Sequence, residues 1–302
     1  MAILSDYHYY APSTLGEVLD LLSSYKSPAV LSGGSDLIVN LKSGRVEHDA
    51  IIDIKQLQKS ELALLKKLEC KGETLFIGSL VTFSEIINSK IVQKRAPLLV
   101  EMAKTVASVG VRNRASMVGN ICSAVPCMDS APVLLVYDAL VHTKSIDDER
   151  TLAIQKFFIS PRKTLLRKKD LVMGISLALP KGKLGSRFVK LMRYRGEDLA
   201  QANLAILALS ANHEYRVAFG SLSGTPLRAT AIEKVLRGEA TLTEELLTKV
   251  KNILPTLISP ITDIRASKEY RLHMAKVMLE RGLLDAALRR EGSGSHLGEN
   301  LI

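Results

Sequence analysis

The apolar positions of the first helical segments recur every three or four residues. Thr14-Leu-Gly-Glu17 is typical of a capping box, and the apolar side chains that follow it recur at Leu15, Val18, Leu19 and Leu22. Thr82-Phe-Ser-Glu85 repeats this signal and predicts a helix toward Ile91. Pro97 predicts the start of a further helix that runs to about Ser108.

Strands are predicted where an apolar run is short and closed by turn residues. They cover residues 29–31, 51–54, 62–68, 74–78 and 171–179, with a hairpin around Lys71-Gly72-Glu73. The apolar run 132–139 fits either a helix or a strand. Beyond Pro180-Lys-Gly182 the pattern predicts three antiparallel strands, at 187–192, 203–210 and 215–220, with a tight turn at Asn212-His213. Three helices then begin near Thr230, at Thr241 or Thr243, and near Ser267.

These elements predict an α+β fold with two domains, for which 302 residues leave ample room. Residues 1–180 form the first domain, with subdomains of about 1–57 and 58–180, and the Pro/Gly break separates it from a second domain, 183–290, that combines a small antiparallel sheet with helices. Residues 291–302 are rich in Gly and Ser and predict a flexible tail.

Composition and cysteine usage limit the class of protein to which the chain can belong. With 47% hydrophobic and 24% charged residues the chain is globular, and we find no signal peptide and no membrane span. Cys70, Cys122 and Cys127 are too few for a disulfide framework, and they lack the partners of a zinc or iron–sulfur site. We therefore expect a cytoplasmic protein that binds no metal itself.

The net charge of +10 is concentrated in one segment. Between Pro161 and Arg195 eleven basic residues face a single acidic one, Asp170. Such a segment fits a solvated face, a docking surface for an anionic cofactor or acidic partner, or a nucleic-acid site. Nucleic acid is disfavoured, because only 5% of the residues are aromatic and no base-stacking motif accompanies the basic run.

Two segments concentrate small and hydrogen-bonding residues, Ser32–Asp36 and Arg112–Asn120. Glycine lets backbone amides converge on an anion without a Cβ in the way, although each segment alone could equally be a turn. Both lie in one domain, with no nucleophile–base pair, no GxGxxG and no Walker loop, so they favour binding a diphosphate over hydrolysing one.

The same segments begin an ordered series of motifs that resembles the FAD-binding subunits of molybdenum hydroxylases, such as xanthine dehydrogenase, CO dehydrogenase and 4-hydroxybenzoyl-CoA reductase. Leu31-Ser-Gly-Gly-Ser-Asp-Leu37 with Lys42 resembles AGGTDL…K, and Val111–Ile121 resembles IRNxxTxGGNI. Further matches continue in order to Arg271, and they are Pro126–Pro132, Lys190–Ala200, Phe219–Arg228 and Asp263–Arg271.

The resemblance implies an FAD site between two α+β subdomains, closed by a C-terminal α+β domain. By position, a first loop would cradle the pyrophosphate with its amides, and it comprises Leu31, Ser32, Gly33, Gly34, Ser35, Asp36 and Leu37. Ser116, Gly119 and Asn120 would hold it from the other side. Asp129 would accept from adenosine-side hydroxyl groups, Val106 would lie near the isoalloxazine, and Lys190 would reach the flavin from the second domain. Each of these three residues also has a purely structural alternative. Asp129 could cap a helix, Lys190 could lie on a solvated face, and Val106 could belong to the core.

In function, the resemblance implies an electron-transfer subunit. It would take electrons from the 2Fe–2S clusters of a small subunit, which receives them from a large molybdopterin subunit, and pass them to an external acceptor. The three subunits would form a heterotrimer or a dimer of heterotrimers. Two rivals are a self-contained FAD oxidase or reductase, for which we find no histidine in a fitting motif, and a scaffold subunit without flavin.

Two positions depart from the family pattern. Val118 stands where the family pattern has the first glycine of GGN. A valine disfavours a positive φ, so this residue favours the alternative of a scaffold subunit without flavin. Leu199 stands where an aromatic residue is frequent, and no four-cysteine insertion for an extra iron–sulfur cluster is present.

Overall fold

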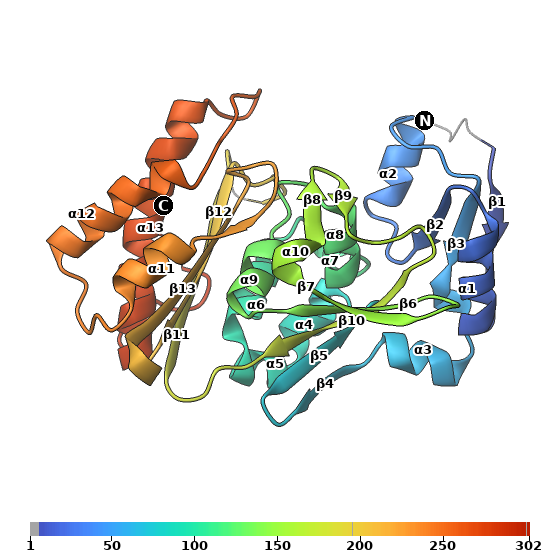
Figure 1. Cartoon of the computed structure of the whole chain (residues 1–302), viewed down its shortest axis with the longest axis horizontal. Helices are drawn as coiled ribbons and strands as arrows, with labels where there is room; N and C mark the ends of the chain where they lie inside the picture. The colour runs from blue at the N-terminus through green and yellow to red at the C-terminus, as the bar shows by residue number, and fades with distance from the viewer. Residues whose placement is uncertain (1–5, 195, 300) are drawn as a thin grey trace.

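The computed structural model describes residues 6–194, 196–299 and 301–302. Three bodies follow one another along the long axis of the molecule, in chain order from the N-terminus to the C-terminus (Figure 1). Each is built on its own sheet, and a small two-stranded hairpin joins the middle body.

The first body is a three-stranded parallel sheet in the order β1-β3-β2. Its elements are β1 (His8–Tyr10), α1 (Leu15–Ser24), β2 (Pro28–Leu31), α2 (Leu37–Lys42), β3 (Ala50–Asp53) and the 3-10 turn η1 (Ile54–Gln56). The predicted capping box is confirmed, because the Thr14 side chain accepts from the Glu17 amide and Glu17 accepts from the Thr14 amide. Residues 32–36 form the loop at the carboxyl end of β2, between the sheet and α2.

The strand predicted over 62–68 is wrong. That stretch forms α3 (Lys59–Leu65), and the strand β4 (Leu68–Lys71) begins only at its last residue. Leu65 is fully buried and Leu62 packs beside it at helical spacing, while Leu64 is 50% exposed. Lys, Glu, Leu and Ala are all strong helix formers, so the short apolar run was assigned the wrong period.

The middle body is an antiparallel sheet in the order β4-β5-β10-β6-β7 with helices packed on one face (Figure 1). Its other strands are β5 (Thr74–Gly78), β6 (Leu140–Lys144), β7 (Glu149–Ala153) and β10 (Leu171–Ala178), and the hairpin consists of β8 (Phe158–Ser160) and β9 (Lys163–Thr164). Its helices are α4 (Phe83–Asn88), α5 (Lys90–Arg95), α6 (Pro97–Lys104), α7 (Val109–Arg112), α8 (Met117–Ser123), α9 (Ser130–Val136) and α10 (Ile154–Phe157). The helix predicted toward Ile91 therefore ends at Asn88, and the one predicted to Ser108 ends at Lys104.

The third body is an antiparallel sheet, β11-β12-β13-β14, whose long helix α13 packs on β11 and β12. Its elements are β11 (Leu184–Leu191), β12 (Ala202–Leu209), η2 (Ala211–His213), β13 (Glu214–Gly220), β14 (Leu227–Arg228), α11 (Thr230–Leu236), α12 (Glu244–Ile253), η3 (Leu254–Thr256) and α13 (Lys268–Glu291). Every residue of β12 is buried, because α9 of the middle body covers the other face. The tight turn is confirmed, with positive φ at Asn212 and His213.

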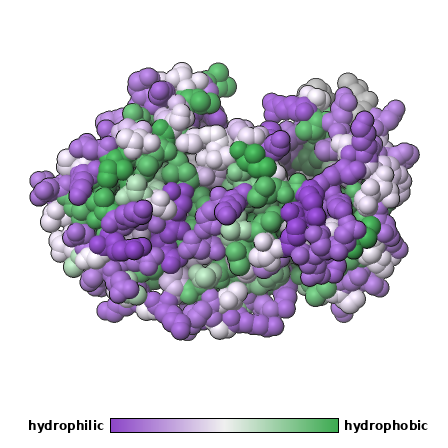
Figure 2. All heavy atoms as spheres, viewed as in Figure 1, coloured by the Kyte–Doolittle hydropathy of each residue, from purple (hydrophilic) through white to green (hydrophobic). Residues whose placement is uncertain are grey.

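One hydrophobic core joins the middle and third bodies. Phe188, Ala205, Leu207 and Ala218 of the third sheet belong to the same cluster as the helices and strands of the middle body. Hydrophilic side chains cover most of the face seen in Figure 2, with hydrophobic patches on the middle and C-terminal parts. None of the helices among the described residues is long and apolar enough to cross a membrane.

The tail after α13 lies against the third body. Its Ser295 hydroxyl accepts from Arg187 at 3.0 Å, and its Ser295 carbonyl accepts from Arg289 at 3.0 Å. Leu301 and Ile302 pack on the core of the same body. The segment predicted to be flexible is therefore in contact with the domain along most of its length.

Candidate cofactor-binding site

The two glycine-containing segments meet across the first and middle bodies, although they are some eighty positions apart in sequence. The Ser32 and Ser116 hydroxyl groups lie 3.2 Å apart, and the Arg114 Nε donates to the Gly33 carbonyl at 3.4 Å. A Cβ on Gly33 would lie 2.0 Å from the Arg114 carbonyl oxygen, so no larger residue fits. The contact explains why glycine is needed at this point.

The loop of residues 32–36 keeps its amides available. The backbone N–H groups of Ser32, Gly33, Gly34, Ser35 and Asp36 donate no hydrogen bond to any described residue. Gly34 has a φ of +75°, which favours glycine. Leu31 and Leu37 anchor the ends of the loop in a small apolar cluster. This arrangement suits an anion held by backbone amides.

Ser116, Gly119 and Asn120 lie at the start of α8. Ser116 caps that helix and accepts from the Gly119 amide at 3.0 Å. The Oδ1 atom of Asn120 is buried and has no partner among the described residues. An unsatisfied buried acceptor is costly, and a bound hydroxyl or N–H group would satisfy it.

Val118 does not face this loop in the way the sequence suggested. It lies inside α8, is 3% exposed, and packs in the core of the middle body. Its φ is not positive, so the expected clash between a β-branched residue and the loop conformation does not arise.

Asp129, Lys190 and Asn203 form a separate buried cluster between the middle and third bodies. The Lys190 ammonium lies 2.6 Å from Asp129 Oδ2, and the Asn203 amide donates to Asp129 Oδ1 at 2.8 Å. Burial raises the pKa of Asp129, and the Lys190 charge opposes that shift. Asp129 occupies the N-cap position of α9, as the structural alternative had it, but its side chain makes no hydrogen bond to the helix. Lys190 is buried and does not lie on a solvated face.

A backbone segment links this cluster to the loops. Lys190 also donates to the Thr105 carbonyl at 3.0 Å, and Arg112 donates to the carbonyls of Val106 and Ala107 at 2.7 and 2.6 Å. Val106 is buried in the core cluster, while Ala107 adopts a positive φ of 38°. The segment is thus fixed from two sides, next to the helix that leads into Arg112–Asn120.

Three contributors to the site were not predicted. Lys55 donates to the carbonyls of Leu31 and Ser32, Arg162 lies 3.7 Å from Asp36, and Asn203 binds Asp129. Arg162 belongs to the basic segment, but nothing in the sequence around Lys55 or Asn203 marks them out. Their roles depend on contacts between distant segments.

The basic segment is not a single patch. Arg167 pairs with Asp148 and Asp170, Lys169 pairs with Asp147, and Arg193 pairs with Asp198. Arg187 and Lys190 are buried between the bodies. The acidic turn between β6 and β7 pairs with Arg167 and Lys169, and Arg187, Lys190 and Arg193 pair with other carboxylates. The segment therefore does not present all of its charge on one docking surface.

All three cysteines are free thiols. Burial raises the pKa of Cys122 to about 12, and burial also raises that of Cys127 against an opposing effect of Arg265. Among the described residues no three His, Cys, Asp or Glu side chains are grouped to hold a metal ion.

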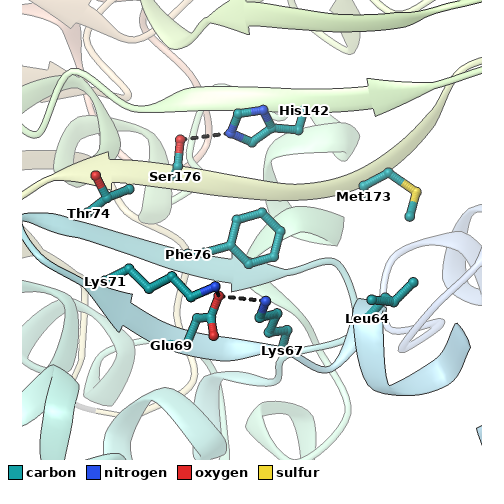
Figure 3. A pocket seen from close by; sticks show the side chains of 9 residues that line it. All are labelled: Leu64, Lys67, Glu69, Lys71, Thr74, Phe76, His142, Met173 and Ser176. Carbon is teal, nitrogen blue, oxygen red and sulfur yellow. Dashed lines mark hydrogen bonds and ion pairs between the residues drawn. The ribbon is translucent and has the colours of Figure 1, made fainter. Parts of the chain in front are cut away.

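The open face of the middle sheet carries a groove of about 500 Å³ (Figure 3). Leu64, Phe76 and Met173 supply apolar side chains, and His142 donates to or accepts from the Ser176 hydroxyl at 2.7 Å. Burial lowers the pKa of His142. None of the candidate cofactor residues lines this groove.

The sequence of the chain matches known family models over most of its length. The chain belongs to the family described as FAD binding domain in molybdopterin dehydrogenase, which matches residues 5–180. The CO dehydrogenase flavoprotein C-terminal domain matches residues 187–286. The resemblance inferred from the motifs is thereby confirmed, as are the α+β fold class and FAD as the cofactor of the family.

Individual relatives extend over nearly the whole chain. The xanthine dehydrogenase FAD-binding subunit of Escherichia coli O157:H7 is 29% identical over 288 residues, covering 94% of this chain and 97% of that one. The carbon monoxide dehydrogenase medium chain of Hydrogenophaga pseudoflava is 28% identical over 281 residues, covering 92% and 96%. The solved structure of carbon monoxide dehydrogenase from the latter organism, lacking the Mo-pyranopterin moiety, matches with a TM-score of 0.89 at 28% identity and covers 96% of this chain and 99% of that one.

Proposed function

We propose that this chain is the FAD-binding electron-transfer subunit of a molybdenum hydroxylase complex. When bound, FAD would supply the redox chemistry, accepting electrons from iron–sulfur clusters and releasing them to an external acceptor. The observation that carries the proposal is the contact between the two loops at Ser32 and Ser116. On one loop five consecutive amides have no acceptor among the described residues, and on the other the buried Asn120 Oδ1 has no partner among them.

The residues of this chain would bind and orient the cofactor. The amides of Ser32, Gly33, Gly34, Ser35 and Asp36, with Leu31 and Leu37 anchoring the loop, would hold the diphosphate, with Ser116, Gly119 and Asn120 opposite. Val106 and the fixed carbonyls around it would border the ring system. Asp129 and Lys190 would contribute to the site through the segment that Lys190 holds at Thr105, since the two side chains are already paired with each other.

The partners are part of the same proposal. We propose a small 2Fe–2S subunit and a large molybdopterin subunit, in a heterotrimer or its dimer, located in the cytoplasm. The full-length similarity to a xanthine dehydrogenase FAD-binding subunit and a carbon monoxide dehydrogenase medium chain supports this assembly. The division into domains at 1–180 and 183–290 also remains a proposal, supported by the two family matches.

The first experiment asks whether the chain holds flavin. Purified protein should show a flavin absorption spectrum and release FAD on denaturation, or take up added FAD. Gly33→Ala should abolish uptake, because its Cβ would meet the Arg114 carbonyl at 2.0 Å. Gly110→Ala is the matched control, since the nearest atom to its Cβ would lie at 3.8 Å. A colourless chain that takes up no FAD would refute the proposal and favour a scaffold.

The second experiment asks whether the chain works in a complex. Tagged protein from its native host should co-purify with subunits that contain iron–sulfur clusters and molybdenum. A flavin-containing chain that purifies alone and turns over a substrate would instead indicate a self-contained oxidase or reductase.

A further inference from the structure

The side chain of Lys55 contacts backbone carbonyl groups at the start of the loop of residues 32–36. Lys55 follows β3 in the turn η1, and its ammonium donates to the Ser32 carbonyl at 2.9 Å and to the Leu31 carbonyl at 3.3 Å. The ammonium also lies 2.6 Å from Asp53 Oδ1. A residue on one strand of the parallel sheet thus binds the loop that leaves the neighbouring strand.

Asp53 fixes the position of this ammonium. Its side chain is 6% exposed, and its second oxygen accepts from the Tyr9 hydroxyl at 2.9 Å. The Lys55 amide donates to Asp53 Oδ1 at 2.9 Å. Three adjacent strands therefore contribute to one chain of hydrogen bonds, from Tyr9 on β1 through Asp53 on β3 to the carbonyl groups at the end of β2.

The contact decides which way the loop amides point. In a trans peptide the carbonyl and the following N–H point in opposite directions, and the described residues contain no cis peptide bond. With the carbonyls of Leu31 and Ser32 directed at Lys55, the N–H groups of Ser32 and Gly33 are directed away from it. On the far side Arg114 holds the Gly33 carbonyl, which sets the direction of the Gly34 N–H in the same way.

We propose that Lys55 is a positioning residue that aims the amides of Ser32 and Gly33 at the diphosphate of the cofactor; this rests on the proposed FAD site. The ammonium holds the carbonyl ends of two peptide dipoles, so the positive ends form a preset anion cradle. The fold itself does not need this lysine, because the pairing of β2 with β3 already fixes the base of the loop and the Lys55 side chain is 34% exposed.

The test compares Lys55→Met with Lys55→Arg in the full chain. Lys59→Met serves as control, since Lys59 is exposed and lies outside the site. Dissociation constants for FAD and for ADP, which carries the same diphosphate, are measured by flavin fluorescence and by displacement. Lys55→Met should weaken both ligands about tenfold, as expected for the loss of charge-assisted hydrogen bonds. Lys55→Arg should restore most of the affinity, and Lys59→Met should match the wild type.

The thermal midpoint of the ligand-free chain separates positioning from general stability. In Lys55→Met it should fall only slightly, because Asp53 loses the ammonium but keeps its hydrogen bonds from the Tyr9 hydroxyl and from the backbone amide of residue 55. Unchanged affinity for FAD and ADP in Lys55→Met would overturn the inference, as would a loss that accompanies a clearly lower midpoint and is not restored by arginine. If Gly33→Ala abolishes binding and Lys55→Met does not, the inference alone fails. If the wild-type chain binds neither FAD nor ADP, the proposed function fails.

Discussion

Lys190 and Asp129 form an ion pair whose removal should weaken the junction between the middle and third bodies. The two side chains are 3% and 8% exposed, and they lie 2.6 Å apart. Asn203 donates to the other carboxylate oxygen and Thr105 accepts from the ammonium, so each charge has a second partner. The perturbation of interest is Lys190→Met, which keeps the length of the side chain and removes only its charge and donors.

The expected cost follows from burial. Leaving one member of a buried ion pair without its partner costs about 3–5 kcal/mol, whereas replacing both members by side chains of similar size costs far less. Lys190→Met and Asp129→Asn should therefore each lower the free energy of unfolding by an amount in this range. The double variant should lose clearly less than the sum of the two, because neither remaining group is then a buried, uncompensated charge.

The pH dependence gives a second, independent signature. Burial already raises the pKa of Asp129, and loss of Lys190 removes the charge that opposes the shift. A carboxyl with a raised pKa binds its proton more tightly in the folded chain than in the unfolded one. The deficit of Lys190→Met should therefore shrink as the pH falls through the raised folded value toward the ordinary range of an aspartate.

Urea unfolding followed by far-UV circular dichroism, at neutral and acidic pH, measures these quantities. A deficit below about 1 kcal/mol for Lys190→Met at neutral pH, or additive effects in the double variant, would refute the assignment of a buried and coupled pair.

Three further outcomes follow from the structure. Val118→Gly should destabilise the chain by about 2–4 kcal/mol, because it removes a buried side chain and places glycine in a helix. FAD affinity should not improve, and tighter binding in a fluorescence titration would contradict the placement of Val118 in the core of the middle body. The hydrogen bond from Arg167 lowers the pKa of Asp148 to about 2, so the contribution of Asp148 to stability should be present above its unfolded pKa and lost as the pH falls toward 2. Asp148→Asn should abolish this part of the pH dependence of urea unfolding, and an unchanged pH profile would contradict the assignment. Removal of residues 293–302 should lower the thermal midpoint by several degrees, because Arg187 and Arg289 lose their Ser295 contacts, and an unchanged midpoint would show that the tail adds nothing.

Local signals in the sequence predicted the elements best. The capping boxes at Thr14 and Thr82 give the two helix starts correctly, and the turn at Asn212-His213 closes the expected hairpin. Residues 62–68 were assigned the wrong period, since a seven-residue run of Leu, Ala and Lys satisfies both a short strand and two turns of helix. Tertiary packing on Leu65 decides between them.

Only those residues of the candidate site that lie within recognisable sequence motifs could be predicted. Ser32 and Ser116 could be identified from their sequence neighbourhoods, and the structure brings them together. Lys55 and Asn203 could not be found in this way, because each acts on a segment distant in sequence. The ion pairs of the basic segment could not be predicted for the same reason, since Asp147 and Asp148, which pair with Lys169 and Arg167, lie about twenty positions earlier in the turn between β6 and β7.

The core that runs through Phe188, Leu207 and Ala218 makes the sequence boundary near residue 180 a poor place to cut. A fragment ending there would leave the apolar side of α6 and α9 without its cover, and the remaining fragment would expose both that face of β12 and the buried Arg187. Because they share this core, we expect the two halves that the family models match separately to unfold together. Gene fusions, split tags and recombination between homologues should be tolerated at the Gly182 turn only while both halves are made together.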